Sequence, residues 1–238
     1  MADFDAPEAL EEVFWRTRHG PEYITPEALV PHQISVETLT AYRRYQALIC
    51  HRYSKSRYLA KNNNLMLRLA PLAEAMPDAT FLVPVRDPAA QAASLLSQHH
   101  RFIKPDSFTT RYMRWLAHFE FGADQRPFRL PGQPPLRGTP DQPDYWLSLW
   151  CAVYGYLETI IDTHPGTVLP VLYEDLGTDP DVWQRIARRL EIPAEADPGF
   201  RPATPKDGAV HDPDLLDQAR ALYRRLQTHV ISGTMPKA

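Results

Sequence analysis

The chain has 238 residues, of which 44% are hydrophobic and 23% are charged, a composition typical of a globular domain with a sizeable core. Its formal net charge of −3 gives no sign of a nucleic-acid or membrane-surface partner. The two cysteines are too few for a disulfide framework, and the acidic N-terminus is unlike a signal peptide. We therefore expect one cytoplasmic domain over residues 1–238, without a nucleic-acid or membrane partner.

In chain order, the spacing of apolar residues predicts four helices and two strands in the first half of the chain. Ser35 is a suitable N-cap for the second helix. The predicted helices cover residues 7–16, 34–53, 63–76 and 88 to about 98, and the predicted strands are RYLA (57–60) and FLVPV (81–85).

Proline is about twice as frequent as in an average protein, with 24 residues. Many of them fall in residues 127–144, which predicts an irregular loop of the kind that often covers a binding site. A partly aromatic helical segment over 112–122 precedes this loop. After the loop we predict helices over 145–164, 179–192 and 213–230, and a strand over 168–173.

Strands that alternate with helices indicate an α/β fold with a parallel sheet flanked by helices. Only three segments have the pattern of a strand, which is few for so many helices. Pro84 and Pro170 lie inside two of these strands, although proline belongs at sheet edges or bulges. We therefore expect a parallel sheet that lacks at least one strand.

Cations follow two of the predicted strands, Lys61 after the first and Arg86 after the second. Ligands of parallel sheets bind beyond the carboxyl ends of the strands, so neighbouring strands would bring both charges to one crevice. The next helix has Asp87 as N-cap and Pro88 in its first turn, and its positive end favours an anion. Ser94 lies two helical turns after Asp87, on the same face. The pattern predicts a phosphate site; the alternative is that Arg86 pairs with Asp87 and Ser94 only packs among small neighbours.

The segment RYLAKNNNLMLRLAPLAEAMPDATFLVPVRDPAAQAASLL resembles the central part of the sulfotransferases that use PAPS (3′-phosphoadenosine 5′-phosphosulfate), most closely the tyrosylprotein and carbohydrate branch. That family has a lysine after one strand, a Pro-Asp-Ala turn, a second strand, Arg-Asp-Pro, and a serine eight residues after the arginine. Lys61, Arg86 and Ser94 match these positions. The segment VLYEDLGTDPDVWQRIARRLEIP resembles the family's Tyr-Glu-Asp-Leu strand end and the helix after it. The resemblance covers residues 55–100 and 168–193.

The resemblance implies an α/β fold like that of the P-loop nucleotide-binding proteins and transfer of a sulfuryl group from PAPS, without a metal, to a hydroxyl or amine. Arg86 and Ser94 would bind the 3′-phosphate of PAPS. Lys61 would be the catalytic residue at the bridging oxygen or the sulfuryl group, where a cation stabilises the developing negative charge. The acceptor would be a small molecule, a carbohydrate or a peptide, and an exposed gap in the sheet would favour an oligomer.

The family's 5′-phosphosulfate loop has no counterpart in the sequence. In the family, a first strand leads into Gly-x-x-Arg-Ser-Gly-Thr at a helix start, and the glycines let backbone N–H groups surround the phosphate. The only glycine among the first 121 residues is Gly20, with no predicted strand before it. We expect a chain that is N-terminally truncated or lacks the loop. The alternative is a non-catalytic nucleotide- or partner-binding relative, whereas a phosphotransferase would need the same loop.

The residue that takes the proton from the acceptor hydroxyl is not fixed by the sequence. The candidates are Glu11, Glu12, His99, His100, Glu174 and Asp175, and Lys206 is a further candidate for a loop over the nucleotide. The simpler interpretations are structural. Glu11 and Glu12 would form a solvated acidic helix start, and His99 and His100 would be surface histidines. Glu174 and Asp175 would cap loops or pair with arginines. His118 and Glu120 would lie on different faces of a helix, which argues against a metal pair.

Overall fold

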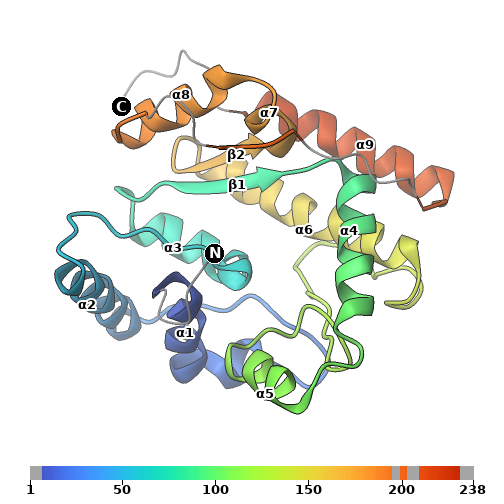
Figure 1. Ribbon diagram of the computed structural model, residues 1–238, viewed down its shortest axis with the longest axis horizontal. Coiled ribbons are helices and arrows are strands. Elements are labelled where there is room, and N and C mark those ends of the chain that lie inside the picture. Colours follow the sequence, from blue (N-terminus) through green and yellow to red (C-terminus); the bar gives the residue numbers. More distant parts are fainter. Residues whose placement is uncertain (1–6, 195–198, 203–208, 231–238) are drawn as a thin grey trace. The chain divides into compact units, whose positions relative to one another are not determined.

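The computed structural model describes residues 7–194, 199–202 and 209–230 (Figure 1). The chain forms two compact units, each made of two segments. Unit 1 consists of Met1–Ala75 and His99–Leu130, and unit 2 consists of Met76–Gln98 and Pro131–Ala238. The fold is a mostly helical α/β arrangement with one small parallel sheet, which lies in unit 2.

Unit 1 is helical. Its helices are α1 (Pro7–Tyr23), α2 (Val36–Arg52), the 3-10 helix η1 (Asn63–Arg68), α3 (Leu69–Ala75) and α5 (Ser107–Trp115). Ser35 caps α2 as predicted, because its hydroxyl accepts the Thr38 N–H at 3.1 Å. α1 and α2 pack through aromatic rings, with the Tyr42 centroid 4.6 Å from that of Trp15 and 5.5 Å from that of Phe14. This packing buries the inner face of α1.

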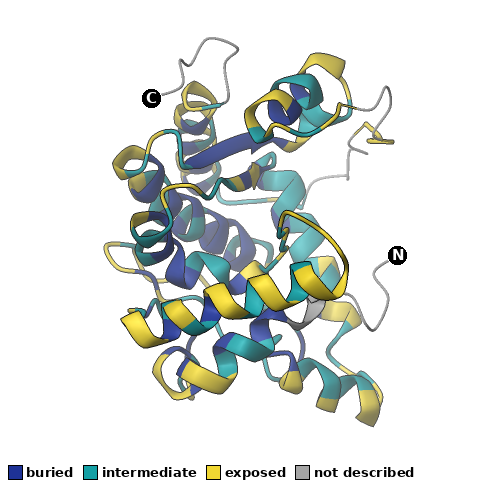
Figure 2. Ribbon diagram, turned by 90° about the vertical axis from the view of Figure 1, so that its left-hand side faces the viewer, coloured by how far each residue is buried: buried dark blue, intermediate teal, exposed yellow. Residues whose placement is uncertain are grey.

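Unit 2 contains the sheet and the helices around it. Its elements are β1 (Phe81–Val85), α4 (Pro88–Arg101), which begins in this unit, α6 (Pro143–Thr163), β2 (Val168–Leu172), α7 (Tyr173–Leu176), α8 (Pro180–Leu190) and α9 (Pro213–Thr228). The strands are parallel, with Phe81 paired with Val168 and Val85 with Leu172. β2 is buried at every residue and packs on α6 and α9, whereas β1 is exposed at Leu82 and Pro84 (Figure 2).

Three helices of unit 2 begin with Asp-Pro. Asp87, Asp179 and Asp212 each accept a backbone N–H two or three residues later at 2.9 Å, and the proline that follows needs no N–H partner in the first turn. The predicted starts of α4, α8 and α9 are therefore confirmed, and their ends differ from the prediction by two or three residues.

Residues 57–60 form no strand, so the prediction of a strand there is wrong. Leu59 is 85% exposed, and the Tyr58 hydroxyl donates to a buried carboxylate instead. The sheet has two strands rather than three. Each strand of such a sheet has an unpaired edge, where proline is tolerated, and this accounts for Pro84 and Pro170 inside β1 and β2.

The segment after α5 also differs from the predicted helix over 112–122. Asp106 caps α5, which ends at Trp115, and the chain then turns at Ala117, whose φ is 56°. The predicted proline-rich loop is irregular apart from an isolated bridge at Phe128. α6 begins at Pro143, slightly before the predicted end of that loop.

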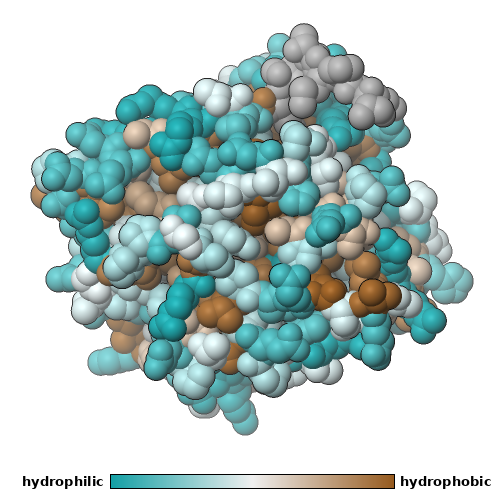
Figure 3. Space-filling view, turned by 180° about the vertical axis from the view of Figure 1, so that it is seen from behind, coloured by the Kyte–Doolittle hydropathy of each residue, from teal (hydrophilic) through white to brown (hydrophobic). Residues whose placement is uncertain are grey.

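Two properties of the described residues concern the surface. None of the helices in the described ranges is long and apolar enough to cross a bilayer. On the face drawn in Figure 3, hydrophobic residues form small separate groups among hydrophilic ones. The expected oligomer therefore stays a prediction.

Candidate functional site

The side chain of Arg86 lies at the carboxyl edge of the two parallel strands. Val85 pairs with Leu172 at the ends of the two strands. The residues that follow them, Arg86 and Tyr173, are therefore neighbours at this edge. The Arg86 guanidinium lies over the Tyr173 ring, 5.0 Å from its centroid. Its Nε is buried and has no hydrogen-bond partner in the described parts of the chain. A buried donor of this kind is costly unless a ligand or solvent satisfies it.

Asp87 serves the start of α4 rather than its neighbour Arg86. Its Oδ1 accepts the Ala90 N–H at 2.9 Å, and the described ion pairs include none between Arg86 and Asp87. The Asp87 N–H donates to Glu174 Oε1 at 2.9 Å, and Glu174 Oε2 accepts the Tyr223 hydroxyl at 3.0 Å. Two N–H groups at this helix start are thus occupied by the protein's own carboxylates. The expectation that the helix end itself attracts an anion is therefore weakened.

Ser94 and Arg86 belong to the same unit, and Ser94 is partly buried on α4. α4 is fixed against α6, because the Trp150 indole N–H donates to Gln91 Oε1 at 3.2 Å. α6 is in turn tied to β1, since the Tyr154 hydroxyl donates to the Pro84 carbonyl at 2.7 Å. These bonds hold β1 and the first part of α4, which carry both predicted phosphate ligands, against α6.

Lys61 lies in unit 1 and is exposed. It follows no strand, but the three asparagines after it hold this segment, which we call the lysine loop (residues 61–64, of which Asn63 and Asn64 are the first residues of η1). Asn62 donates to Glu12 Oε2 at 2.7 Å, Asn63 to Glu120 Oε1 at 3.5 Å, and Asn64 to the Ala117 carbonyl at 3.2 Å. Arg86 and Ser94 belong to unit 2, so the expectation that Lys61 shares a crevice with them stays a prediction.

The simpler interpretation of Glu11 and Glu12, a solvated acidic helix start, is wrong. Only 0% and 4% of their surfaces are exposed. Arg68, itself 0% exposed, binds Glu12 through Nη1 at 2.8 Å and Nη2 at 3.1 Å. The guanidinium lies between the rings of Trp15 and Tyr23, 4.9 Å from each centroid. The guanidinium and the carboxylate are thus joined by two hydrogen bonds. In this bidentate geometry, the attraction between the charges best offsets the cost of removing them from water.

The two carboxylates share Asn62 but otherwise have different partners. Burial raises the pKa of Glu12, but the charge and bonds of Arg68, with further bonds from Tyr23 and Asn62, lower that pKa by more. Glu11 accepts the Trp15 indole N–H at 3.1 Å and the Tyr58 hydroxyl at 2.8 Å. Burial and the charge of Glu11 raise the pKa of Tyr58, which keeps Tyr58 a hydrogen-bond donor. The network therefore stabilises the ionised Glu12 carboxylate inside unit 1.

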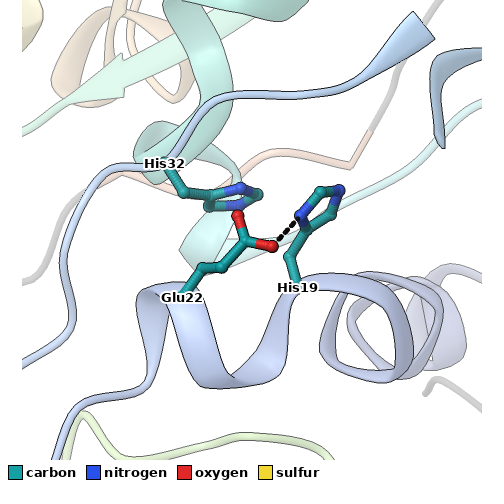
Figure 4. A group of neighbouring side chains, drawn as sticks. All are labelled: His19, Glu22 and His32. Carbon is teal, nitrogen blue, oxygen red and sulfur yellow. Dashed lines mark hydrogen bonds and ion pairs between the residues drawn. The ribbon is translucent and has the colours of Figure 1, made fainter. Parts of the chain in front are cut away.

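Three potential metal ligands of unit 1, His19, Glu22 and His32, have ligand atoms within 4.8 Å of one another (Figure 4). His19 Nδ1 lies 3.0 Å from Glu22 Oε1. His32 Nδ1 lies 3.0 Å from the Gln33 carbonyl, which can only accept, and His32 Nε2 accepts the Nε–H of Arg68 at 3.1 Å. A metal on His32 would have to displace a buried guanidinium, whose charge repels a cation. The group therefore does not fit a metal in this arrangement.

His32 should make the protein sensitive to acid. Burial and the charge of Arg68 lower its pKa from 6.5 to about 4. As the pH falls from 6.5 towards 4, the unfolded chain takes up a proton that the folded chain does not, so the free energy of unfolding should fall. We expect the Tm of the wild type to drop across this window more than that of His32→Gln, which keeps a donor and an acceptor but does not titrate. Equal dependence of Tm on pH in thermal melts of both proteins would contradict this prediction.

The remaining candidates have structural contacts. His99 is buried, not a surface histidine, and its Nδ1 accepts the Gly122 N–H at 3.2 Å; His100 is exposed. Gly122 has φ 83°, and a Cβ there would lie 2.4 Å from the Phe102 carbonyl oxygen, so only glycine fits. Glu174 caps α4, as the structural interpretation expected. Lys206 lies outside the described residues.

His118 and Glu120 do not lie on opposite faces of a helix, because their segment is not helical. His118 Nδ1 lies 3.3 Å from Glu120 Oε1. No pattern in the sequence signals this pair, because it depends on the turn at Ala117.

No protein-family model, curated protein or solved structure matches this chain significantly. The resemblance to sulfotransferases therefore rests on the residues themselves and stays a hypothesis.

Proposed function

We propose that the protein is a PAPS-dependent sulfotransferase that moves a sulfuryl group to a hydroxyl or amine acceptor, and that unit 2 is part of a fold like that of P-loop nucleotide-binding proteins. The observation that carries this proposal is Arg86. Its guanidinium lies at the carboxyl edge of parallel strands, where α/β proteins bind ligands. Its buried Nε lacks a partner among the described residues, and an oxyanion would satisfy it.

The proposed roles follow the resemblance. Arg86 and Ser94, on the β1–α4 junction, bind the 3′-phosphate. Lys61 contacts the bridging oxygen or the sulfuryl group and stabilises the charge that develops on the leaving phosphate. The acceptor is a small molecule, a carbohydrate or a peptide, and no metal takes part.

Glu174 should weaken the phosphate site. Its carboxylate binds the N–H of Asp87, next to Arg86, so it repels a phosphate bound there. We expect Glu174→Gln, whose amide oxygen can still accept the Asp87 N–H while its NH2 group donates to the Tyr223 oxygen, to bind 3′-phosphoadenosine 5′-phosphate (PAP) about 3- to 10-fold more tightly. Calorimetric titration measures this, with Asp181→Asn as a control for loss of an exposed charge elsewhere in unit 2. Unchanged or weaker binding by Glu174→Gln alone would place the phosphate away from this helix start.

The direct test of the function is turnover. Purified protein is incubated with PAPS and a panel of alcohols, phenols, amines, oligosaccharides and tyrosine peptides, and PAP and sulfated products are detected by chromatography and mass spectrometry. Acceptor-dependent formation of both products supports the proposal. PAP binding without turnover would favour the non-catalytic nucleotide-binding relative, and phosphoryl transfer from ATP would favour a phosphotransferase.

A further inference from the structure

The lysine loop contacts a second pair of titratable residues, His118 and Glu120, within unit 1. The left-handed turn at Ala117 places two side chains that are two residues apart in the sequence against each other, with His118 Nδ1 3.3 Å from Glu120 Oε1. Asn63 of the lysine loop donates to the same carboxylate oxygen at 3.5 Å. The charge of Lys61 also acts on His118. Asn63, His118 and Glu120 therefore form one local group, and Lys61 lies two residues before Asn63 in the chain.

Glu120 is the buried member of this group, with 7% of its surface exposed. Its Oε1 receives His118 and Asn63, while its Oε2 is buried and has no hydrogen-bond partner among the residues described. The stability of a buried carboxylate with so few hydrogen-bond donors depends strongly on each of those donors. This dependence raises the affinity of the His118 ring for a proton.

His118 is the accessible member, with 38% of its side chain exposed. Glu120 holds its Nδ1, so Nε2 is the nitrogen left to exchange a proton with another molecule. Burial lowers the pKa of His118, but the hydrogen bond and charge of Glu120 raise it by more, helped by Glu12 and opposed by Lys61. The result is a basic imidazole whose tautomer and orientation are fixed by a carboxylate, the arrangement that general bases commonly have.

We propose that His118 is the general base of the reaction and that Glu120 is its positioning residue, an inference that rests on the proposed sulfuryl transfer. The acceptor oxygen uses a lone pair to form a bond to sulfur while its proton passes to His118 Nε2. The bond between sulfur and the bridging oxygen of PAPS breaks, and its electron pair leaves on the phosphate of PAP. Lys61 stabilises that leaving group.

A purely structural role for the pair would be to hold the turn after α5. The two roles differ in what they change. A structural role alters stability and affects all acceptors equally. A general base alters the dependence of the rate on pH and on the acidity of the acceptor, because an acceptor that is already ionised needs no base.

The test compares wild type, His118→Asn, Glu120→Gln and the control His51→Asn, which removes an exposed histidine of unit 1. With an aliphatic alcohol identified in the acceptor panel, or the least acidic phenol if no alcohol reacts, we expect kcat to fall by about 10²- to 10⁴-fold in His118→Asn. With 4-nitrophenol, which is largely ionised at the pH of the assay, the loss should be at least tenfold smaller. His51→Asn should match the wild type with both acceptors.

Glu120→Gln gives a second readout. In this variant, His118 loses the carboxylate that raises the pKa of its ring. The rising limb in a plot of kcat against pH should therefore move to lower pH. PAP binding should stay unchanged. The inference is overturned if His118→Asn folds and loses activity equally with both acceptors, if it loses none, or if the limb does not move in Glu120→Gln. If His118→Asn does not fold, the Glu120→Gln profile decides. A folded wild type that transfers no sulfuryl group overturns the proposed function and this inference with it.

Discussion

Replacing Arg68 by methionine should lower the free energy of unfolding by about 3–5 kcal/mol at neutral pH. The Glu12 carboxylate stays buried in this variant but loses both guanidinium bonds and the positive charge. The methionine side chain would fill the space between the rings of Trp15 and Tyr23 but would provide no cation–π contact. The cost is therefore that of an unpaired buried charge rather than that of a cavity. Chemical denaturation at pH 7 measures it.

The pH dependence tests this cause, and His32 contributes in the same direction because the charge of Arg68 also lowers its pKa. In the wild type, Arg68 helps to lower the pKa of Glu12 below its ordinary value, so the stability from the pair is full above that ordinary value and decreases as the pH falls through the lowered one. In Arg68→Met, burial is no longer opposed, so Glu12 takes up a proton more readily. The difference between the two proteins should therefore shrink at acidic pH.

Two controls accompany this prediction. Arg44→Met removes an exposed arginine of α2 and should change the free energy of unfolding by less than about 0.5 kcal/mol. The double variant Glu12→Gln with Arg68→Met removes both charges of this buried pair and should lose less than the sum of the two single variants. A loss below about 1 kcal/mol in Arg68→Met would show that the pair contributes little to stability.

Replacing Arg86 by alanine should weaken PAP binding by about 10- to 100-fold, the size expected for loss of charge-assisted hydrogen bonds to a phosphate. The effect should be specific, because the side chain is at the strand edge and stacks on Tyr173 rather than filling the core. Arg86→Lys keeps a charge but loses the planar fork, so its affinity should be intermediate.

Arg188→Ala is the matched control, since it removes an exposed arginine of α8 in the same unit. Its PAP affinity should equal that of the wild type. Circular dichroism and thermal melts of all three variants exclude unfolding as the cause. PAP affinity in Arg86→Ala within twofold of the wild type would remove Arg86 from the nucleotide site.

Short sequence patterns were sufficient to predict several helices and strands of the fold. The Asp-Pro starts of α4, α8 and α9, the Ser35 cap and the continuous apolar runs of β1 and β2 each depend on a few neighbouring residues, and each is confirmed. The strand at RYLA was wrong because a run of four residues with few apolar side chains carries too little information to separate a strand from a loop. There, tertiary contacts decide the conformation.

The buried network of unit 1 could not be predicted, because its bonds join residues far apart in the chain. Glu12 and Arg68 are brought together by the packing of α1 against η1, and an acidic residue near a helix N-terminus is usually solvated. One signal was available. Arg68 interrupts the apolar run LMLRLAPL (residues 65–72), and a charged residue on a buried face requires a partner.

The candidate site was predictable only within one unit. The spacing of Arg86, Asp87 and Ser94 fixed the β1–α4 junction, and the structure adds that Asp87 caps α4 while Tyr173 supports the guanidinium. The role of Glu174 at this helix start depends on β2 lying beside β1, and spacing along the chain carries no such information. The contact between His118 and Glu120 was not predictable either, because it depends on the turn at Ala117.

If Arg86 marks a site for the 3′-phosphate of PAPS, the protein should distinguish two nucleotides that differ only in that group. Calorimetric titration of the wild-type protein with PAP and with adenosine 5′-phosphate makes this comparison. We expect PAP to bind at least about tenfold more tightly. Equal affinity for the two nucleotides, or binding of neither, would contradict the assignment of Arg86 to a 3′-phosphate site.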